Sequence, residues 1–244
     1  VLDLANTVTV MRNGQVVRTN LVQNESVESL VTAMLGKTMA QMYPPKGEVS
    51  SDAPIALRVK GLRSEILDGI DLDVREGEIV GLAGLVGSGR SRLARTLFGA
   101  ETILGGEIAV SGKTVLIKTV RDAMRAGISM LPESRKEQGL LLKQSVQLNI
   151  TLPHLAELTS LGGIIRSRTE ADETTKLISA VNVQPPNAHN RVNSLSGGNQ
   201  QKVLFAKWLF KSPRIFIIDE PTRGIDVGAK QSIYELITNL AKQG

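Results

Sequence analysis

Gly84-Leu-Val-Gly-Ser-Gly-Arg-Ser91 is the stretch of sequence that decides the fold. The apolar run 79–83 before it predicts a strand, and the apolar-faced segment 93–98 after it predicts a helix. Glycines in such a turn let backbone N–H groups point inward around phosphate oxygens, and the helix N-terminus adds partial positive charge. The Ser91 hydroxyl could ligate Mg²⁺, whereas Arg90 stands where such loops usually carry lysine. Taken alone, the stretch also fits a Gly-rich strand-to-helix turn without a ligand.

On both sides of this stretch, short apolar strands alternate with helical patterns. Further strands are predicted at 55–59, 70–74, 107–110, 115–117, 128–131 and 215–218. Helices are predicted near 120–126, over much of 143–185, after Gly198 and from about 228 to 241. Strands that alternate with helices favour an α/β fold with a largely parallel sheet.

The N-terminal part has a different pattern. Two β-branched runs within 7–19 flank Asn13-Gly14, a dipeptide that favours a tight hairpin turn. Residues 24–35 then predict a capped helix. From about 36 to 54 the periodicity fades around Pro44-Pro45, which indicates a linker.

A second motif, Leu195-Ser-Gly-Gly-Asn-Gln-Gln201, opens a predicted helix. Ser196 offers a hydroxyl, and Gly197 and Gly198 offer free backbone N–H groups to an anion. The same residues also fit an ordinary capped helix after a flexible turn.

A third motif ends an apolar strand, Ile215-Phe-Ile-Ile-Asp-Glu-Pro221. It delivers two carboxylates at the carboxyl end of a strand, where α/β sheets bind ligands. Asp219 could hold Mg²⁺ through water, and Glu220 could orient or deprotonate an attacking water. Acidic residues that merely end a strand are the alternative interpretation.

The composition limits the class of protein. The 244 residues include 41% hydrophobic and only 3% aromatic residues, so aliphatic side chains must fill a globular core. The absence of cysteine excludes disulfides and thiolate metal sites and is compatible with a reducing cytosol. A net charge of +5 would suit nucleic acid, an anionic membrane or phosphate ligands, but the charges are scattered, which favours an ordinary basic protein. No apolar run reaches the roughly 20 residues that cross a bilayer, so a membrane role would require a partner.

The order of the three motifs resembles the ABC-type ATPase family, in which a Walker A loop, a signature motif and a Walker B strand follow one another. Asp226, in Gly224-Ile-Asp226, falls at that family's D-loop position. Four segments sharpen the resemblance: 81–90, Pro132-Glu-Ser-Arg-Lys-Glu-Gln-Gly-Leu140, 195–202 and 219–229. Together they are similar to the second nucleotide-binding domain in tandem ATP-binding subunits of ribose-, galactose- and xylose-type sugar importers.

The resemblance implies a fold and a division of the chain. The fold is that of an ABC-type P-loop NTPase, with a largely parallel core sheet, a small antiparallel β subdomain and a helical subdomain that carries the signature motif. The division gives 1–43 as the tail of a preceding nucleotide-binding domain, 44–54 as a linker and 55–244 as a second, C-terminally truncated domain. Its helical subdomain would span about 143–210.

The function implied is that of the ATP-binding subunit of a bacterial sugar importer, which couples ATP binding and hydrolysis to carbohydrate uptake. The implied partners are an integral membrane sugar permease, received in a groove near residues 133–150, and the first nucleotide-binding domain or a second copy. A periplasmic sugar-binding protein would act indirectly, and no nucleic acid partner is expected. The implied location is the cytoplasmic face of the inner membrane, as a peripheral subunit. No residue reports which sugar is carried.

The implied site is shared by two domains that sandwich ATP head to tail. Nucleotide would lie on Gly84, Leu85, Val86, Gly87, Ser88, Gly89, Arg90 and Ser91. Ser91 and Asp219 would hold Mg²⁺, and Glu220 and Glu133 would be the catalytic residues. The partner domain's site would receive Ser196, Gly197, Gly198, Asn199 and Asp226.

Several positions depart from the working pattern of the family. Glu133 stands where active members carry a glutamine, and Arg90 replaces lysine with a bulkier planar cation. No aromatic residue between Ile55 and Ile79 can stack on adenine. The family's switch histidine would lie beyond Gly244, and neither His154 nor His189 fits that role. These departures predict a loop that binds nucleotide but hydrolyses it poorly.

Two alternatives stay open at this point. A degenerate regulatory nucleotide-binding domain would share the motifs but release little phosphate. ABC-type ATPases of DNA repair or translation would share them too, but those classes predict a coiled-coil insert, zinc-binding cysteines or a long charged linker. The chain carries none of these features.

Overall fold

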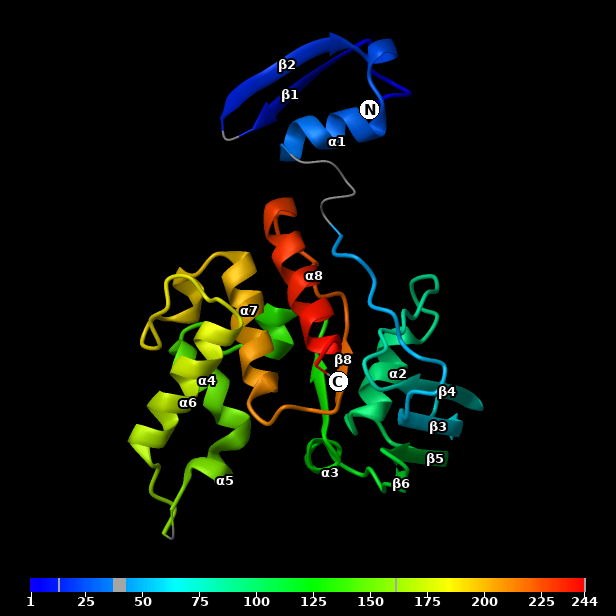
Figure 1. Cartoon of the computed structure of the whole chain (residues 1–244), viewed down its shortest axis with the longest axis vertical. Coiled ribbons are helices and arrows are strands. Elements are labelled where there is room, and N and C mark those ends of the chain that lie inside the picture. Colours follow the sequence, from blue (N-terminus) through cyan, green and yellow to red (C-terminus); the bar gives the residue numbers. More distant parts are fainter. Residues whose placement is uncertain (13, 37–42, 161, 244) are drawn as a thin grey trace.

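The computed structural model describes residues 1–12, 14–36, 43–160 and 162–243, and its N-terminal elements pack on one another (Figure 1). β1 (Thr7–Arg12) and β2 (Gln15–Leu21) form an antiparallel hairpin, followed by the 3-10 turn η1 (Val22–Asn24) and helix α1 (Val27–Leu35). The hairpin and the helix confirm the sequence prediction, although Asn13 of the predicted turn lies outside the described residues.

α1 begins where its first turn finds side-chain partners. Ser26 is the N-cap residue, and it exchanges hydrogen bonds with Ser29 in a capping box. The predicted linker contains no helix or strand over 43–54, and its residues 37–42 lie outside the described part of the chain.

A four-stranded antiparallel sheet has the strand order β4-β3-β5-β6. Its strands are β3 (Ile55–Arg63), β4 (Ile70–Arg75), β5 (Gly105–Val110) and β6 (Lys113–Thr114). The central β3 buries alternate side chains, including Leu57 and Val59. The sheet is the small antiparallel unit that the sequence predicts.

Gly106 of β5 lies directly against the backbone of β3. Gly106 has a φ of +96°, and a Cβ there would lie 2.6 Å from the Leu62 Cα. Only glycine satisfies both the backbone angle and the contact.

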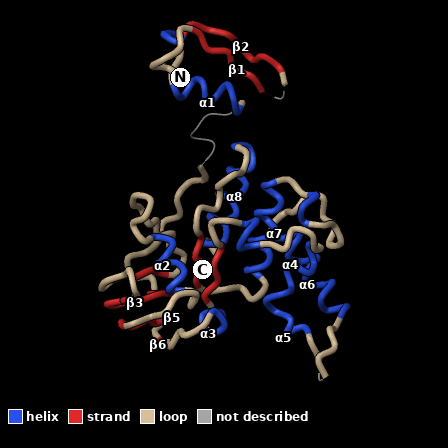
Figure 2. Tube along the Cα trace, turned by 180° about the vertical axis from the view of Figure 1, so that it is seen from behind, coloured by secondary structure: helices blue, strands red, loops and turns tan. Residues whose placement is uncertain are grey.

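A parallel pair of strands lies between two groups of helices. β7 (Ile128–Leu131) follows α3 (Val120–Arg125) and pairs in parallel with β8 (Ile215–Ile218), which leads into α8 (Val227–Ala241). Figures 1 and 2 place α2 (Arg90–Leu97) on one side of these strands and α7 (Gly197–Leu209) on the other.

The prediction of a strand at 79–83 is wrong. Within the described parts of the chain these residues belong to no strand, and Ile79 is 57% exposed. Residues 79–82 line a groove of about 840 Å³ together with β8. An extended run becomes a strand only when it forms hydrogen bonds with a neighbour, and β8 is paired with β7 alone among the described strands.

The prediction of a strand at 115–117 is also wrong. β6 ends at Thr114, and the Val115 N–H then donates to the Ile108 carbonyl at 2.8 Å before the chain turns away. Ile117 is buried in the core, so the apolar signal reports burial rather than a strand.

Short helices make up the region between β7 and β8, as predicted. They are the π-turn η3 (Arg135–Gly139), α4 (Val146–Thr151), η4 (Leu152–His154), α5 (Leu155–Leu158), α6 (Ser167–Ala180) and η5 (Val192–Ser194), followed by α7. The fully buried Asn149 fixes the 141–145 loop to α4, because its side chain binds both the N–H and the carbonyl of Leu141. Among the described residues, no helix combines the length and the apolar character needed to span a bilayer.

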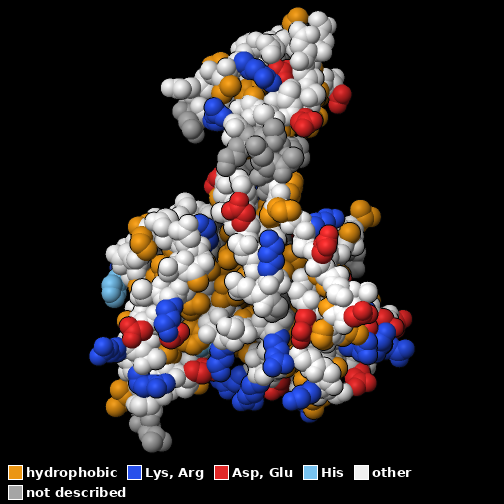
Figure 3. Space-filling model, in the orientation of Figure 1, with side chains coloured by type: hydrophobic (Ala, Val, Ile, Leu, Met, Phe, Trp, Pro, Cys, Tyr) orange, Lys and Arg blue, Asp and Glu red, His pale blue; other side chains and the backbone are white. Residues whose placement is uncertain are grey.

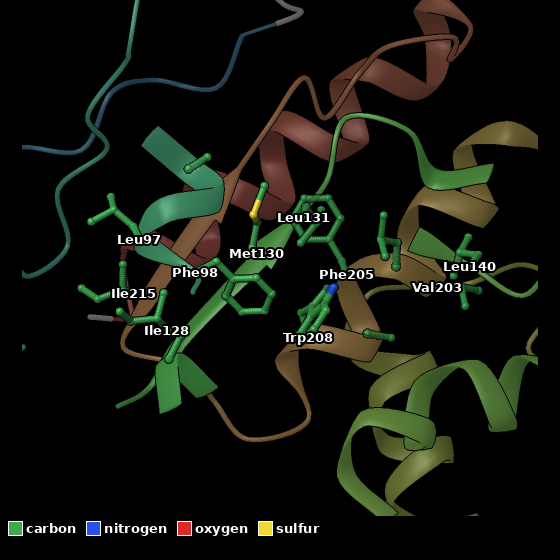
Figure 4. Packing of buried hydrophobic residues seen from close by; sticks show 14 of the residues in the cluster. Leu97, Phe98, Ile128, Met130, Leu131, Leu140, Val203, Phe205, Trp208 and Ile215 are labelled. Atoms are coloured by element: carbon green, nitrogen blue, oxygen red, sulfur yellow. The ribbon is translucent and has the colours of Figure 1, made fainter. Parts of the chain in front are cut away.

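One hydrophobic core joins the sheets to the helices (Figure 4). Phe98, just after α2, contacts Trp208 of α7 edge to face, with ring centroids 5.2 Å apart. Phe205 of α7 makes a similar contact with Phe216 of β8 at 5.6 Å. Because α2 and α7 share this core, the two motifs that begin these helices are held by one packed unit.

Candidate functional site

Residues 84–91 form a turn that enters the N-terminus of α2, as predicted. Gly87 and Gly89 have φ values of +87° and +93°, which L side chains rarely adopt. A Cβ on Gly84 would come within 2.5 Å of the Ser88 Oγ, so this glycine lets the turn close on itself. The first turn of a helix leaves its N–H groups unsatisfied, so this end of α2 can receive an anion.

Arg90, the first residue of α2, reaches the acidic pair at the end of β8. Its Nη1 lies 3.8 Å from the Glu220 Oε1. Both side chains are partly exposed, so the ion pair contributes only about 0–1 kcal/mol to stability. Glu220 has a φ of +46°, an uncommon conformation for a residue with a side chain, and such strain often marks functional sites. The contact brings two of the three sequence motifs together.

The ends of β7 and β8 place a third carboxylate at the same edge. The Asp219 N–H donates to the Leu131 carbonyl at 3.0 Å, which carries the parallel register beyond β8. Glu133 follows two residues after Leu131 and forms a close ion pair with Arg223. The negative charge of Glu133 is therefore paired in this structure. Arg223 was not singled out by the sequence analysis, because nothing local to the chain indicates this partner.

The second motif begins α7 on the other side of the strands (Figure 2). Ser196 is the N-cap, and its Oγ accepts hydrogen bonds from the backbone N–H and the side-chain amide of Asn199. Ser196 is exposed, whereas Gly198 is buried and a Cβ there would lie 2.8 Å from the Ala229 Cβ. Within the described residues, no hydrogen bond or ion pair joins this turn to residues 84–91. The hydrogen bonds of Ser196 in the described part of the chain are those within its own turn.

Asp226 serves as the N-cap of α8. Its Oδ1 accepts the Ala229 N–H at 2.8 Å, a bond that stabilises the helix start. The bond orders the end of the loop that follows Glu220.

Arg135 is a second residue to which the sequence analysis gave no role. From η3 it donates to the carbonyls of Arg223 and Gly224, at 2.8 and 2.9 Å. Its sequence signal is the quoted segment 132–140, but only the fold shows what the side chain contacts.

The two histidines lie away from these groups. His154 is buried, its ring stacks on Phe210 at 4.6 Å, and its Nε2 lies 3.1 Å from the Lys207 carbonyl. Burial lowers the pKa of His154, so the neutral form is favoured. This histidine packs the helical region, and His189 is in the loop before η5.

Charges of both signs occur across the face drawn in Figure 3. Lys207 is half-buried: its Nζ donates to the Gly139 carbonyl at 2.8 Å, and partial burial lowers its pKa. The groove of about 840 Å³ near β8 reaches Arg90, Asp219 and Glu220 at one end, but apolar residues form most of its walls. It adjoins the turn 84–91 and does not contain its glycines.

The turn and the strand end fit a nucleotide and its metal. The glycine conformations and the start of α2 suit phosphate oxygens. Ser91 and Asp219 supply a hydroxyl and a carboxylate, which are oxygen donors of the kind Mg²⁺ prefers alongside water and phosphate. In the described part of the chain, no cluster of three or more His, Cys, Asp or Glu side chains forms a self-contained metal site.

Comparison with curated proteins gives relatives over nearly the whole chain. The chain is 44% identical to a ribose import ATP-binding protein RbsA 2 of Burkholderia cenocepacia, over 97% of this chain and 47% of that protein. It is 40% identical to the ribose import ATP-binding protein RbsA of Geobacillus kaustophilus, over 100% of this chain and 49% of that protein. The chain therefore spans about half the length of the curated relatives it matches.

The structural and family comparisons agree with these relatives. The ADP conformation of MJ1267, an ATP-binding cassette of an ABC transporter, has a TM-score of 0.64 at 19% identity and covers 78% of each chain, which shows the fold. The family profile described as ABC transporter matches residues 67–223, more than half of the chain, including the turn 84–91, the Ser196 turn and the acidic pair. The chain belongs to the ABC transporter family.

Proposed function

We propose that this chain is the second nucleotide-binding domain of a tandem ATPase that drives uptake of a small sugar through a membrane permease. The contact between Arg90 and Glu220 carries the proposal, because it brings the phosphate-binding turn to the carboxylate that would act in hydrolysis. The identity of about 40% with ribose import proteins supports the sugar class. On this proposal, 55–244 is that domain, 44–54 is a linker and 1–43 belongs to a preceding domain.

The residues of this chain's own turn would bind the nucleotide phosphates. The N–H groups of 84–91 would surround the β- and γ-phosphates, and Arg90 would neutralise their charge. Ser91 and Asp219 would hold Mg²⁺, which supplies a positive centre for the phosphate oxygens. Glu220 would orient the attacking water and accept its proton, and Glu133 would stand beside the metal.

The second motif would act on a neighbouring domain. Ser196, Gly197, Gly198 and Asn199, with Asp226, would contact the γ-phosphate bound by the first domain of the same protein or by a second copy. Two observations support a role in trans: Ser196 is exposed, and no hydrogen bond or ion pair among the described residues joins its turn to 84–91. Closure of the two domains on ATP would shift the transporter between conformations.

The wider assembly follows from the same proposal. An integral membrane permease would contact residues near 133–150 at the cytoplasmic face of the membrane, and a periplasmic sugar-binding protein would deliver the substrate. No nucleic acid partner is proposed. The mixed charges on the face drawn in Figure 3 support this reading.

A second candidate function is a regulatory domain that binds ATP and hydrolyses it slowly. Two contacts favour it: Arg90 already engages Glu220, and Arg223 already engages Glu133. In this arrangement each arginine occupies a carboxylate that would otherwise be open to the attacking water or the metal. Slow hydrolysis at this domain's own site is compatible with a Ser196 turn that still supports hydrolysis at the site of the neighbouring domain.

The test uses the complete two-domain protein. Because Ser196 would serve the active site of the neighbouring domain, Ser196→Arg should lower ATP turnover on the order of a hundredfold. Glu220→Gln should leave most of the turnover on the regulatory reading, in which this domain's own site hydrolyses slowly, and should lower the turnover if this site hydrolyses ATP as well. Exposed Ser167→Arg and Glu65→Gln serve as matched controls and should match the wild type.

Binding of fluorescent ATP separates the two candidate functions from failure of both. Binding with slow phosphate release from the 84–91 site supports the regulatory reading for this domain. Loss of turnover in Glu220→Gln with full turnover in Ser196→Arg would reverse the proposed assignment. Absence of any nucleotide binding by the complete protein would refute both functions.

A further inference from the structure

Arg135 joins segments to which the proposed function gives separate roles. Its guanidinium donates through Nη1 to the Arg223 carbonyl at 2.8 Å and through Nη2 to the Gly224 carbonyl at 2.9 Å. A planar fork that binds two consecutive carbonyls fixes both the position and the orientation of that loop. The loop runs from Glu220 to Asp226, so one side chain sets the path between the two acidic residues.

The same guanidinium also reaches the turn that begins α7. Its Nε lies 3.4 Å from the Gln200 Oε1, and Gln200 in turn donates to the Leu195 carbonyl at 3.0 Å. Leu195 directly precedes Ser196, and Gln200 is buried. A short chain of hydrogen bonds thus links the loop 220–226 to the residue before the exposed Ser196.

Close packing supports the same link. A Cβ on Gly197 would lie 2.9 Å from the Arg135 Nη2 and 3.5 Å from the Gly224 carbonyl oxygen. Glycine at 197 therefore leaves the space in which the guanidinium meets the loop. Without the Arg135 fork, the turn and the loop would lose their common contact.

The segment that carries Arg135 is itself held in place at both ends. Glu133 pairs with Arg223, and the half-buried Lys207 donates to the carbonyl of Gly139. Burial lowers the pKa of Arg135, and none of its hydrogen-bond partners among the described residues is a carboxylate. The contacts of this arginine are thus suited to holding backbone rather than to balancing charge.

We propose that Arg135 is a positioning residue that keeps the Ser196–Asn199 turn and the 220–226 loop in register, so that both meet the neighbouring domain together. The inference rests on the proposed function, since it assigns the two segments one shared partner. Arg135 itself need not touch nucleotide. Its loss would change the step in which the two domains meet ATP and leave binding at 84–91 intact.

The kinetic test compares Arg135→Ala, Arg135→Lys and the exposed control Arg125→Ala in the complete two-domain protein. Arg135→Ala should lower kcat between about tenfold and about a hundredfold, because small displacements of positioned groups carry such costs. The Kd for fluorescent ATP should stay within about twofold, a change of less than 0.5 kcal/mol by the affinity relation. Arg135→Lys should recover only part of kcat, since an ammonium group cannot present the planar fork. Arg125→Ala should match the wild type.

Hydrogen exchange without nucleotide provides the second readout. In Arg135→Ala, amides of 196–199 and 223–226 should exchange faster, while amides of α2 should be unchanged. The positioning role would be overturned if both segments exchanged at the wild-type rate in Arg135→Ala, or if the kcat of this variant equalled that of the wild type. If the wild-type protein binds no ATP, the proposed function fails, yet faster exchange in both segments would still support the structural link.

Discussion

Replacing Asn149 with alanine removes the side chain that fastens the 141–145 loop to α4. The Asn149 side chain accepts the Leu141 N–H at 2.7 Å and donates to the carbonyls of Leu141 and Ser145 at 3.0 and 2.9 Å. Each of these bonds contributes about 0.5–1.5 kcal/mol, and the Leu141 backbone groups would lose their partner. Alanine returns about 0.5 kcal/mol through its better helix propensity. The net loss in unfolding free energy should be about 1–4 kcal/mol.

Urea unfolding followed by circular dichroism measures this loss. Exposed Asn193→Ala is the matched control and should change the unfolding free energy by less than about 0.5 kcal/mol. Asn149→Asp keeps the acceptor for Leu141 N–H but replaces two donors with a buried negative charge. Its carboxyl should have a raised pKa, because burial disfavours the ionised form. Since the folded-state pKa then exceeds the unfolded value, the deficit should be largest at pH 7 and shrink as the pH falls through the folded-state pKa.

Two results would refute this account of Asn149. One is a loss below about 1 kcal/mol in Asn149→Ala, which would mean that water or a shifted backbone satisfies the Leu141 groups. The other is an Asn149→Asp protein as stable as the wild type at pH 7.

Two further predictions concern a close backbone contact and a buried titrating group. Gly106→Ala should lower the unfolding free energy by at least about 2 kcal/mol, because the new Cβ would lie 2.6 Å from the Leu62 Cα. The control is Gly112→Ala, where φ is also positive but the space is open. Its unfolding free energy should fall by only about 1 kcal/mol. Protonating His154 would place an N–H on its Nδ1, which is buried and has no hydrogen-bond partner among the described residues, and burial already lowers the pKa of this histidine. The unfolded chain therefore binds this proton more readily, so stability should fall below about pH 6.5, by at most about 1.4 kcal/mol per pH unit. Urea curves at pH 7 and 5.5 should show a smaller fall for His154→Gln, and an equal fall in both proteins would contradict the assignment.

The fold could be predicted where the sequence signal and the tertiary contacts agree. β7 and β8 match the apolar runs 128–131 and 215–218, because each run is paired and packed. The run 79–83 has the same apolar character and is not a strand, because a strand depends on a partner that the run itself does not specify. The starts of α7 and α8 lie within a residue or two of the predicted positions, since the caps Ser196 and Asp226 act within one turn, whereas α2 begins at Arg90 rather than at 93.

In the candidate site, local backbone features could also be predicted from the sequence, whereas contacts between distant segments could not. The turn 84–91 could be predicted because its glycines determine a local backbone shape. The partners of Glu133 and Arg135 could not be predicted, since each lies in a segment far away along the sequence and is brought near only by the packing of β7, β8 and α7. Identifying a residue type suited to a reaction does not reveal which neighbour holds it.

Trp208 is the only tryptophan in the sequence, and it is almost fully buried against the edge of Phe98. Its ring thus sits at the junction of α2 and α7, with the Lys207 ammonium 5.7 Å from the ring centroid. Tryptophan fluorescence from this chain consequently comes from a single indole, at the contact between its two motif-bearing helices. A shift in emission wavelength or quenching on adding a ligand would report movement at that joint, with no introduced label.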